Sequence, residues 1–152
     1  MTQIDFYVLD QGNKREAESF ACRLLEKAVQ TSEVIYVHTA SLLQAQQLDA
    51  LLWTYREDSF LPHALYDEEK EAAIPIRIGF AAPDTDYLEN MATNGLLVNL
   101  TTETPAFYRA FPRMMEIVFS DPSMQQLARE RYRQYREEGH SINTHKIKAK
   151  EA

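Results

Sequence analysis

Short apolar runs alternate with longer amphipathic stretches along the chain. Residues 4–9 and 33–38 are rich in aromatic and branched side chains, which favours strands. Residues 14–30 carry apolar side chains at helical spacing and predict an amphipathic helix between them. A second helix is expected after Ser41, where leucines recur on one side. The strand–helix–strand–helix order predicts parallel strands joined by right-handed crossovers.

The second half of the chain continues this alternation. Strands are expected at residues 74–80, 96–100 and 114–119, with a short helix at 104–112. A chain of 152 residues is long enough to fold as one domain with its own core. The pattern therefore predicts a single α/β domain over residues 1–152 with a mostly parallel central sheet.

A helix over residues 121–136 has the clearest boundaries. Asp121 can accept the free backbone N–H groups of the first turn, and Pro122 suits the first helical position, where an N–H is not needed. Gly139 stands just past the end, where a left-handed residue is common. The polar residues that follow predict a loose tail at 143–152.

The two sides of this helix differ in chemistry. Arg129, Arg133 and Arg136 fall at i, i+4 and i+7 and share a face, with Tyr132 beside them. The side predicted to pack on the body carries Met124, Leu127, Ala128, Arg131 and Tyr135. The arginine face has two interpretations. It is either a solvated surface with extended side chains or a cationic, aromatic-lined site for an acidic or carboxylate-bearing partner.

The distribution of charge favours the second interpretation. Residues 126–152 carry seven Lys and Arg against four Asp and Glu, a net of +3, whereas residues 1–125 carry nine against nineteen, a net of −10. A basic end on an acidic body indicates a local anion site. Strong direct binding to a DNA backbone is not expected, because the chain as a whole is acidic.

Signals for export or membrane insertion are not recognisable in the sequence. The first residues show no basic segment followed by an apolar run, and no apolar stretch approaches the ~20 residues that span a bilayer. One cysteine, Cys22, leaves no intrachain disulfide and no cysteine-based metal cluster. We therefore expect a cytoplasmic protein without a membrane partner.

Groups for catalysis or cofactor binding are sparse. None of the four glycines forms a glycine-rich loop of the kind that holds a phosphate, and the four histidines lack metal-binding spacing. No metal, cofactor or catalytic residue is therefore expected. The alternative is a small α/β enzyme or nucleotide binder that uses Asp10, after the first strand, and His38, at the end of the second.

A second apolar cluster lies between the second helix and an acidic loop. It consists of Trp53, Tyr55, Phe60, Leu61, Pro62 and Leu65. These residues either close the core beneath a loop or form a protein-binding patch. The patch is plausible because Trp and other aromatic residues are enriched at binding hot spots.

Three blocks of the sequence match one known family in order and spacing. They are Phe6-Tyr-Val-Leu-Asp10, then Leu48-Asp-Ala-Leu-Leu-Trp53 followed by Ser59-Phe-Leu-Pro-His63, and Gln126-Leu-Ala-Arg-Glu-Arg-Tyr-Arg-Gln-Tyr-Arg136 with Asn143-Thr144. They resemble the chi subunit of bacterial DNA polymerase III. The resemblance implies a Rossmann-like, three-layer fold without a phosphate-binding loop and a non-enzymatic role in the replicative clamp-loader assembly.

The resemblance also implies a site for the acidic C-terminal tail of single-stranded-DNA-binding protein. In the family, this tail binds a Val before the last helix and the Arg and Tyr of an Ala-Arg-Glu-Arg-Tyr motif, which correspond here to Val118, Arg129 and Tyr132. Arg133 and Arg136 would attract the acidic residues of the tail.

A second partner implied by the resemblance is the psi subunit, which tethers chi to the clamp loader. The Trp and Phe of the family's psi-binding block correspond to Trp53 and Phe60, with Pro62, His63 and Leu65 beside them. The same face would engage a helicase partner. Both expectations agree with the two patches found from the residues alone.

Overall fold

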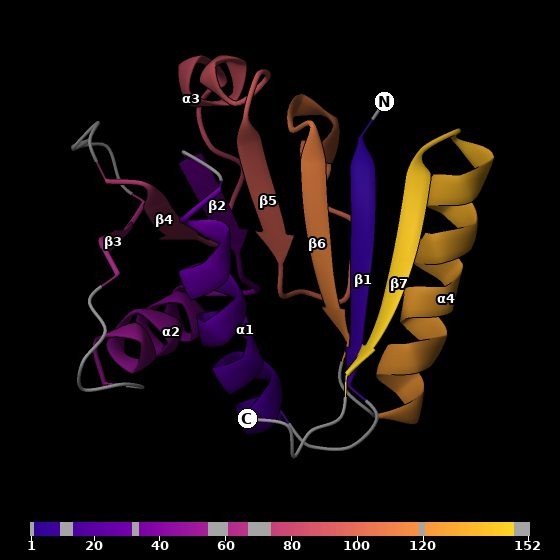
Figure 1. Cartoon of the computed structure of the whole chain (residues 1–152), viewed down its shortest axis with the longest axis horizontal. Helices are drawn as coiled ribbons and strands as arrows, with labels where there is room; N and C mark the ends of the chain where they lie inside the picture. The colour runs from indigo at the N-terminus through magenta and orange to yellow at the C-terminus, as the bar shows by residue number, and fades with distance from the viewer. Residues whose placement is uncertain are drawn as a thin grey trace.

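Seven parallel strands form one sheet in the computed structural model (Figure 1). The structure describes residues 2–9, 14–31, 34–54, 61–66, 74–118 and 121–147. The strand order is β3-β4-β2-β5-β6-β1-β7, and each neighbouring pair is parallel. The strands are β1 (Gln3–Leu9), β2 (Val34–His38), β3 (His63–Leu65), β4 (Ile76–Gly79), β5 (Gly95–Asn99), β6 (Arg113–Val118) and β7 (Ser141–Ile147).

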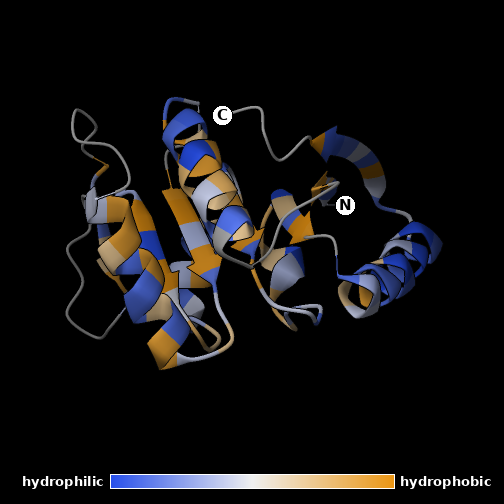
Figure 2. Ribbon diagram, turned by 90° about the horizontal axis from the view of Figure 1, so that it is seen from below, coloured by the Kyte–Doolittle hydropathy of each residue, from blue (hydrophilic) through white to orange (hydrophobic). Residues whose placement is uncertain are grey.

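Helices cover both faces of this sheet. Helices α1 (Lys14–Ala28) and α2 (Leu42–Thr54) pack on one face. Helix α3 (Thr85–Asn90), the 3₁₀ turn η1 (Tyr108–Ala110) and helix α4 (Pro122–Glu137) pack on the other. Figure 2 shows apolar colour mainly on the inner strands of the sheet and mostly polar colour on α4. The three layers confirm the predicted α/β fold with a parallel sheet.

Helix α4 has the predicted ends. The Asp121 carboxylate accepts hydrogen bonds from the Ser123 hydroxyl at 2.6 Å and from the backbone N–H groups of Ser123 at 2.8 Å and Met124 at 3.3 Å. The hydroxyl and then the two N–H groups lower the pKa of Asp121. Pro122 is the first helical residue. Gly139 follows the helix with φ +88°, a conformation that favours glycine. The boundaries of α4 were therefore readable from local sequence.

The loose tail expected at 143–152 is wrong over residues 143–147, which belong to the edge strand β7 (Ser141–Ile147). This strand pairs in parallel with β1, from Gln3 beside Ser141 to Leu9 beside Ile147. Most of its side chains are exposed, so it lacks the apolar alternation that marks a half-buried strand. Backbone hydrogen bonds to β1 hold it instead. Residues 148–152 lie outside the described ranges.

Two smaller elements also differ from expectation. The short helix expected at 104–112 is a single 3₁₀ turn at Tyr108–Ala110, although Phe107 and Phe111 still pack on the sheet. The three-residue strand β3 had no sequence signal of its own. Both elements are too short for hydrophobic periodicity to define them.

Candidate functional site

A pocket of about 530 Å³ between α4 and the sheet brings together all five residues predicted for the acidic partner. They are Val118, Arg129, Tyr132, Arg133 and Arg136. Six further residues, which were not predicted for this site, complete its lining: Phe6, Val8, Gln125, Ala128, Thr144 and Lys146. We call this the α4 pocket.

The α4 pocket has an apolar floor. Val118 ends β6 and is 3% exposed, and Phe6 of β1 is equally buried. The Tyr132 ring lies against the Phe6 ring, with 5.8 Å between centroids and 50° between planes. Phe6 and Val118 share one side of the sheet, because Val118 pairs with Val8, which lies two residues from Phe6 on the same face of β1. The floor can therefore accept an apolar side chain.

The rim of the α4 pocket is cationic. Arg129, Arg133 and Arg136 are exposed on α4, and Lys146 projects from β7. The Arg136 guanidinium lies 6.0 Å from the centre of the Tyr132 ring. No carboxylate lines the pocket among the residues that the structure describes. An anionic group that enters the pocket would therefore meet three arginines and one lysine. Each arginine can donate two parallel hydrogen bonds to a carboxylate.

A buried ion pair fixes how α4 faces the sheet. Glu116 in β6 is fully buried, and Arg131 donates to it from Nε at 3.2 Å and from Nη2 at 3.1 Å. The Tyr135 hydroxyl donates at 2.6 Å and the Asn99 amide at 3.0 Å. Arg131 also donates from Nη1 to the Thr102 carbonyl at 2.7 Å. Every oxygen of the buried carboxylate is thus satisfied.

This network positions the site without touching it. Arg131 and Tyr135 point from the inner side of α4, as their helical positions predicted, so Arg129 and Tyr132 must face the pocket. The sequence did not predict that Glu116 is the buried acidic partner of Arg131. The available signal was a glutamate inside the apolar run of residues 114–119, which calls for a buried cation.

The second predicted surface is only partly described. Trp53, at the end of α2, is 55% exposed and lies on His63, with 4.7 Å between ring centroids. Pro62 is exposed and Leu65 half-buried, whereas His63 is only 7% exposed. Phe60 lies outside the described residues. Trp53 and Pro62 therefore supply the accessible part of this surface.

Both ring nitrogens of His63 have polar contacts. Its Nδ1 lies 2.5 Å from the Leu61 carbonyl oxygen, and its Nε2 lies 3.5 Å from a carboxylate oxygen of Asp49. The contact with Asp49 ties the strand β3 to helix α2. Of the residues predicted for this surface, His63 supports the Trp53 ring instead of presenting its own side chain.

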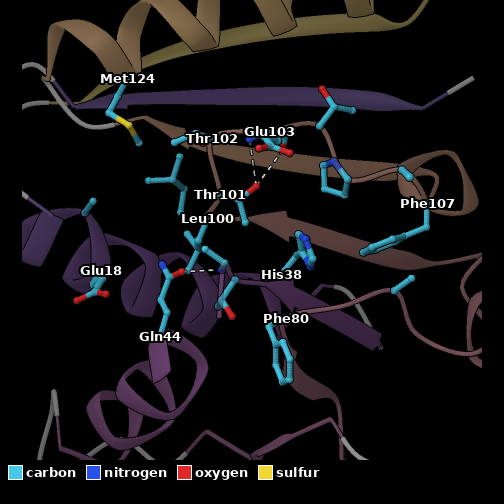
Figure 3. Close-up of a pocket in the computed structure, with 18 residues that line it drawn as sticks. Glu18, His38, Gln44, Phe80, Leu100, Thr101, Thr102, Glu103, Phe107 and Met124 are labelled. Atoms are coloured by element: carbon cyan, nitrogen blue, oxygen red, sulfur yellow. Dashed lines mark hydrogen bonds between the residues drawn. The ribbon is translucent and has the colours of Figure 1, made fainter. Parts of the chain in front are cut away.

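A second pocket, of about 610 Å³, opens beyond the carboxyl ends of β2, β4 and β5 (Figure 3). His38 lines it, and burial lowers the pKa of this imidazole. Within the described residues, His38 Nδ1 is buried without a hydrogen-bond partner, so no carboxylate orients the ring as a general base. Asp10, its proposed companion, lies outside the described ranges.

The described part of the chain shows neither a metal site nor a reactive cysteine. Three or more His, Cys, Asp or Glu side chains do not meet there in a metal-binding arrangement. Burial raises the pKa of the Cys22 thiol to about 12, so it is a poor nucleophile. The described helices are also too short or too polar to cross a bilayer.

Comparison with known proteins points to one family. A family model described as DNA polymerase III chi subunit, HolC, matches residues 1–143. Similar proteins named DNA polymerase III subunit chi include one from Pseudomonas aeruginosa, 37% identical over 97% of this chain and 98% of the relative. Another, from Haemophilus influenzae, is 29% identical over 93% and 95%, and one from Escherichia coli is 28% identical over 95% and 97%.

Solved structures share the fold at low identity. The C-terminal domain of S. cerevisiae Dbp5, bound to Gle1 and IP6, aligns with a TM-score of 0.66 and 13% identity over 99% of this chain and 92% of that chain. T4 UvsW aligns with a TM-score of 0.64 and 8% identity over 97% of this chain and 42% of its own. These similarities describe the arrangement of sheet and helices and carry no functional assignment.

Proposed function

Because the chain belongs to the family of DNA polymerase III chi subunits, we propose that it acts as a non-enzymatic adaptor of the replicative polymerase in the cytoplasm. In this role it joins two proteins. One is a psi subunit, which connects it to the clamp loader, and the other is single-stranded-DNA-binding protein, whose acidic C-terminal tail binds the α4 pocket.

One observation carries the tail-binding proposal. Residues that are separated in sequence, Val118 on β6 and the Arg129–Arg136 face of α4, line a single pocket with an apolar floor and a cationic rim. A protein C-terminus that ends in an apolar residue after several acidic ones matches both features. The pocket is complementary in charge to such a tail and opposite in charge to the rest of the chain.

The binding mode follows from these positions. Arg129 pairs with the terminal carboxylate of the tail, because its guanidinium can donate two parallel hydrogen bonds. The last apolar side chain of the tail enters between Val118 and Tyr132. Arg133 and Arg136 attract the preceding acidic residues, and salt weakens that attraction because both side chains are exposed.

The test is a fluorescence-polarisation titration with a labelled copy of the acidic tail, at a low and at a near-physiological salt concentration. We expect saturable binding that weakens with salt. A matched peptide with an amidated C-terminus should bind much more weakly, because it cannot pair with Arg129 as a carboxylate. Equal binding of the two peptides, or no binding of either, would contradict the proposal.

Lys146 should contribute to this site although it lies in the segment where no strand was expected. Its charge lines the α4 pocket from β7. Lys146→Gln should weaken tail binding by about two- to fivefold, the range for an exposed charge pair worth up to ~1 kcal/mol. The loss should shrink at high salt. Lys27→Gln, on the distant helix α1, is the control and should bind like the parent.

For the psi subunit, we propose the surface around Trp53, continued by Pro62 and Leu65 and by Phe60. An exposed Trp at the end of a helix is the kind of residue that dominates binding energy when a partner buries it. A helicase partner would use the same surface and would therefore compete with psi.

Trp53→Ala should weaken binding of a psi subunit by about 30-fold or more, because truncating a hot-spot residue costs ~2 kcal/mol or more. Isothermal titration calorimetry with purified psi measures this loss. The acidic tail should bind the same variant with unchanged affinity, since the α4 pocket lies on another part of the sheet. Parallel loss of both partners would indicate misfolding and not a binding surface at Trp53.

A further inference from the structure

The pocket beyond β2, β4 and β5 lies where parallel sheets commonly bind ligands. After β2 the chain passes to α2 on one face of the sheet, and after β5 it passes to the η1 turn on the other. Neighbouring strands whose connections leave to opposite faces open a crevice at their carboxyl ends. The volume of about 610 Å³ lies within the range of known binding pockets. We call it the β2–β5 pocket.

Apolar side chains are exposed at its edge. Phe80, which lines the pocket, is 47% exposed. Leu42 and Leu43 do not line it but fall in the sequence between its lining residues Ala40 and Gln44, and they are 49% and 65% exposed. The pairing of His38 with Gly79 places Phe80 next to the turn that leads into α2. Large apolar residues gathered around a pocket mark an interaction surface more strongly than scattered ones.

The charge of the β2–β5 pocket is the reverse of that of the α4 pocket. Glu18 and Glu103 line it, and none of its described lining residues is a Lys or an Arg. Figure 3 shows His38, Phe80 and Phe107 at one end and Glu18 at the other. Burial keeps His38 uncharged near neutral pH by lowering its pKa, so the imidazole offsets neither carboxylate. Phosphates and acidic peptides are therefore disfavoured here.

The wall formed by residues 100–104 is rigid. Asn99 accepts hydrogen bonds from the backbone and hydroxyl of Thr101 and donates to the Glu103 carbonyl. Arg131 holds the carbonyl of Thr102 from the other side. A wall fixed before binding lowers the entropy cost of association.

We propose that the β2–β5 pocket binds a basic segment of a partner protein, with an apolar side chain against Phe80 and a Lys or Arg side chain paired with Glu18 or Glu103. The apolar edge supplies contact area, and the carboxylates select the charge. The chain would then carry two peptide sites of opposite charge preference, one for an acidic and one for a basic partner.

The probe is an acetylated, amidated peptide of alternating Arg and Trp or Leu residues, titrated into the isotope-labelled full chain and followed by NMR. We expect saturable shifts in the amides of residues 38–44 and 100–107, and none with a peptide that has Glu in place of Arg. The double variant Glu18→Gln with Glu103→Gln should bind about fivefold more weakly, because two charge pairs are lost, one at the half-buried Glu18 and one at the exposed Glu103.

A matched double variant separates the pocket from the general acidity of the chain. Glu89→Gln with Glu137→Gln removes the same charge from exposed positions on α3 and α4 and should bind the basic peptide like the parent. Phe80→Ser should weaken the peptide while leaving the acidic tail bound at the α4 pocket.

Four outcomes would overturn the proposal. They are the absence of saturable binding, shifts outside the two segments, equal loss in the two double variants, and shifts of the same size with free arginine amide. The last would identify a site for small cations in place of a peptide site.

Discussion

Replacing Arg131 by methionine should lower the free energy of unfolding by about 3–5 kcal/mol, because it leaves the Glu116 carboxylate buried without its cation. For a chain of this size the melting temperature should fall by roughly 6–20 °C. Urea unfolding followed by circular dichroism measures the first quantity, and a thermal melt measures the second. This is the largest stability effect that we expect from a single charged residue.

Two further variants test the reason for that loss. Arg129→Met removes the same charge from the exposed face of α4 and should change stability by less than about 0.5 kcal/mol. Glu116→Met added to Arg131→Met should recover much of the loss, since an apolar pair of similar size replaces the ion pair. Asn99 and Tyr135 keep other partners in Thr101 and Thr104. If the Arg131 and Arg129 variants were equally stable, the buried network would have no structural role.

Arg129→Ala should weaken binding of the acidic tail by about 1.5–3 kcal/mol, or roughly 10- to 150-fold, the range for hydrogen bonds to a charged group. Stability should not change, because Arg129 is exposed and the buried network does not include it. Fluorescence polarisation with the labelled tail measures the affinity. Together with Arg131→Met, this variant separates binding from folding on one helix.

The amidated tail shows whether Arg129 acts on the terminal carboxylate. With that peptide, Arg129→Ala should cause almost no further loss, so the two changes should be strongly non-additive in a double-mutant cycle. Arg129→Lys should fall between parent and alanine, because it keeps the charge but loses the bidentate geometry. Additive losses would place the carboxylate elsewhere in the pocket.

Local signals made α4 predictable from sequence. Asp121, Pro122 and Gly139 act within a few residues of the helix ends that they define. The spacing of Arg129, Tyr132 and Arg133 on one face followed from the helical period alone. The family resemblance then supplied Val118, which no spacing argument joins to α4. The structure adds that all of these residues line one pocket.

Contacts between residues far apart in the sequence could not be predicted from the sequence. The partner of Glu116 lies on another element, and the pattern of each element shows only that a buried charge needs a cation. Strand β7 was equally unpredictable from the sequence, because its mostly polar side chains lack the alternation typical of a strand and its backbone pairs with the distant β1. Thr144 and Lys146 were not predicted for the α4 pocket, because they reach it only through the pairing of β7 with β1. The prediction for Phe60 concerns a residue outside the described ranges.

The position of β1 between β6 and the edge strand β7 has a consequence during protein synthesis. Gln3 pairs with Arg113 on one side and with Ser141 on the other, so β1 is synthesised before both of the strands that pair with it. At about 5–20 residues per second, both edges of β1 stay open for several seconds while the rest of the chain is made. A nascent chain that stops before β7 keeps one edge of β1 open, and its α4 pocket lacks Thr144 and Lys146.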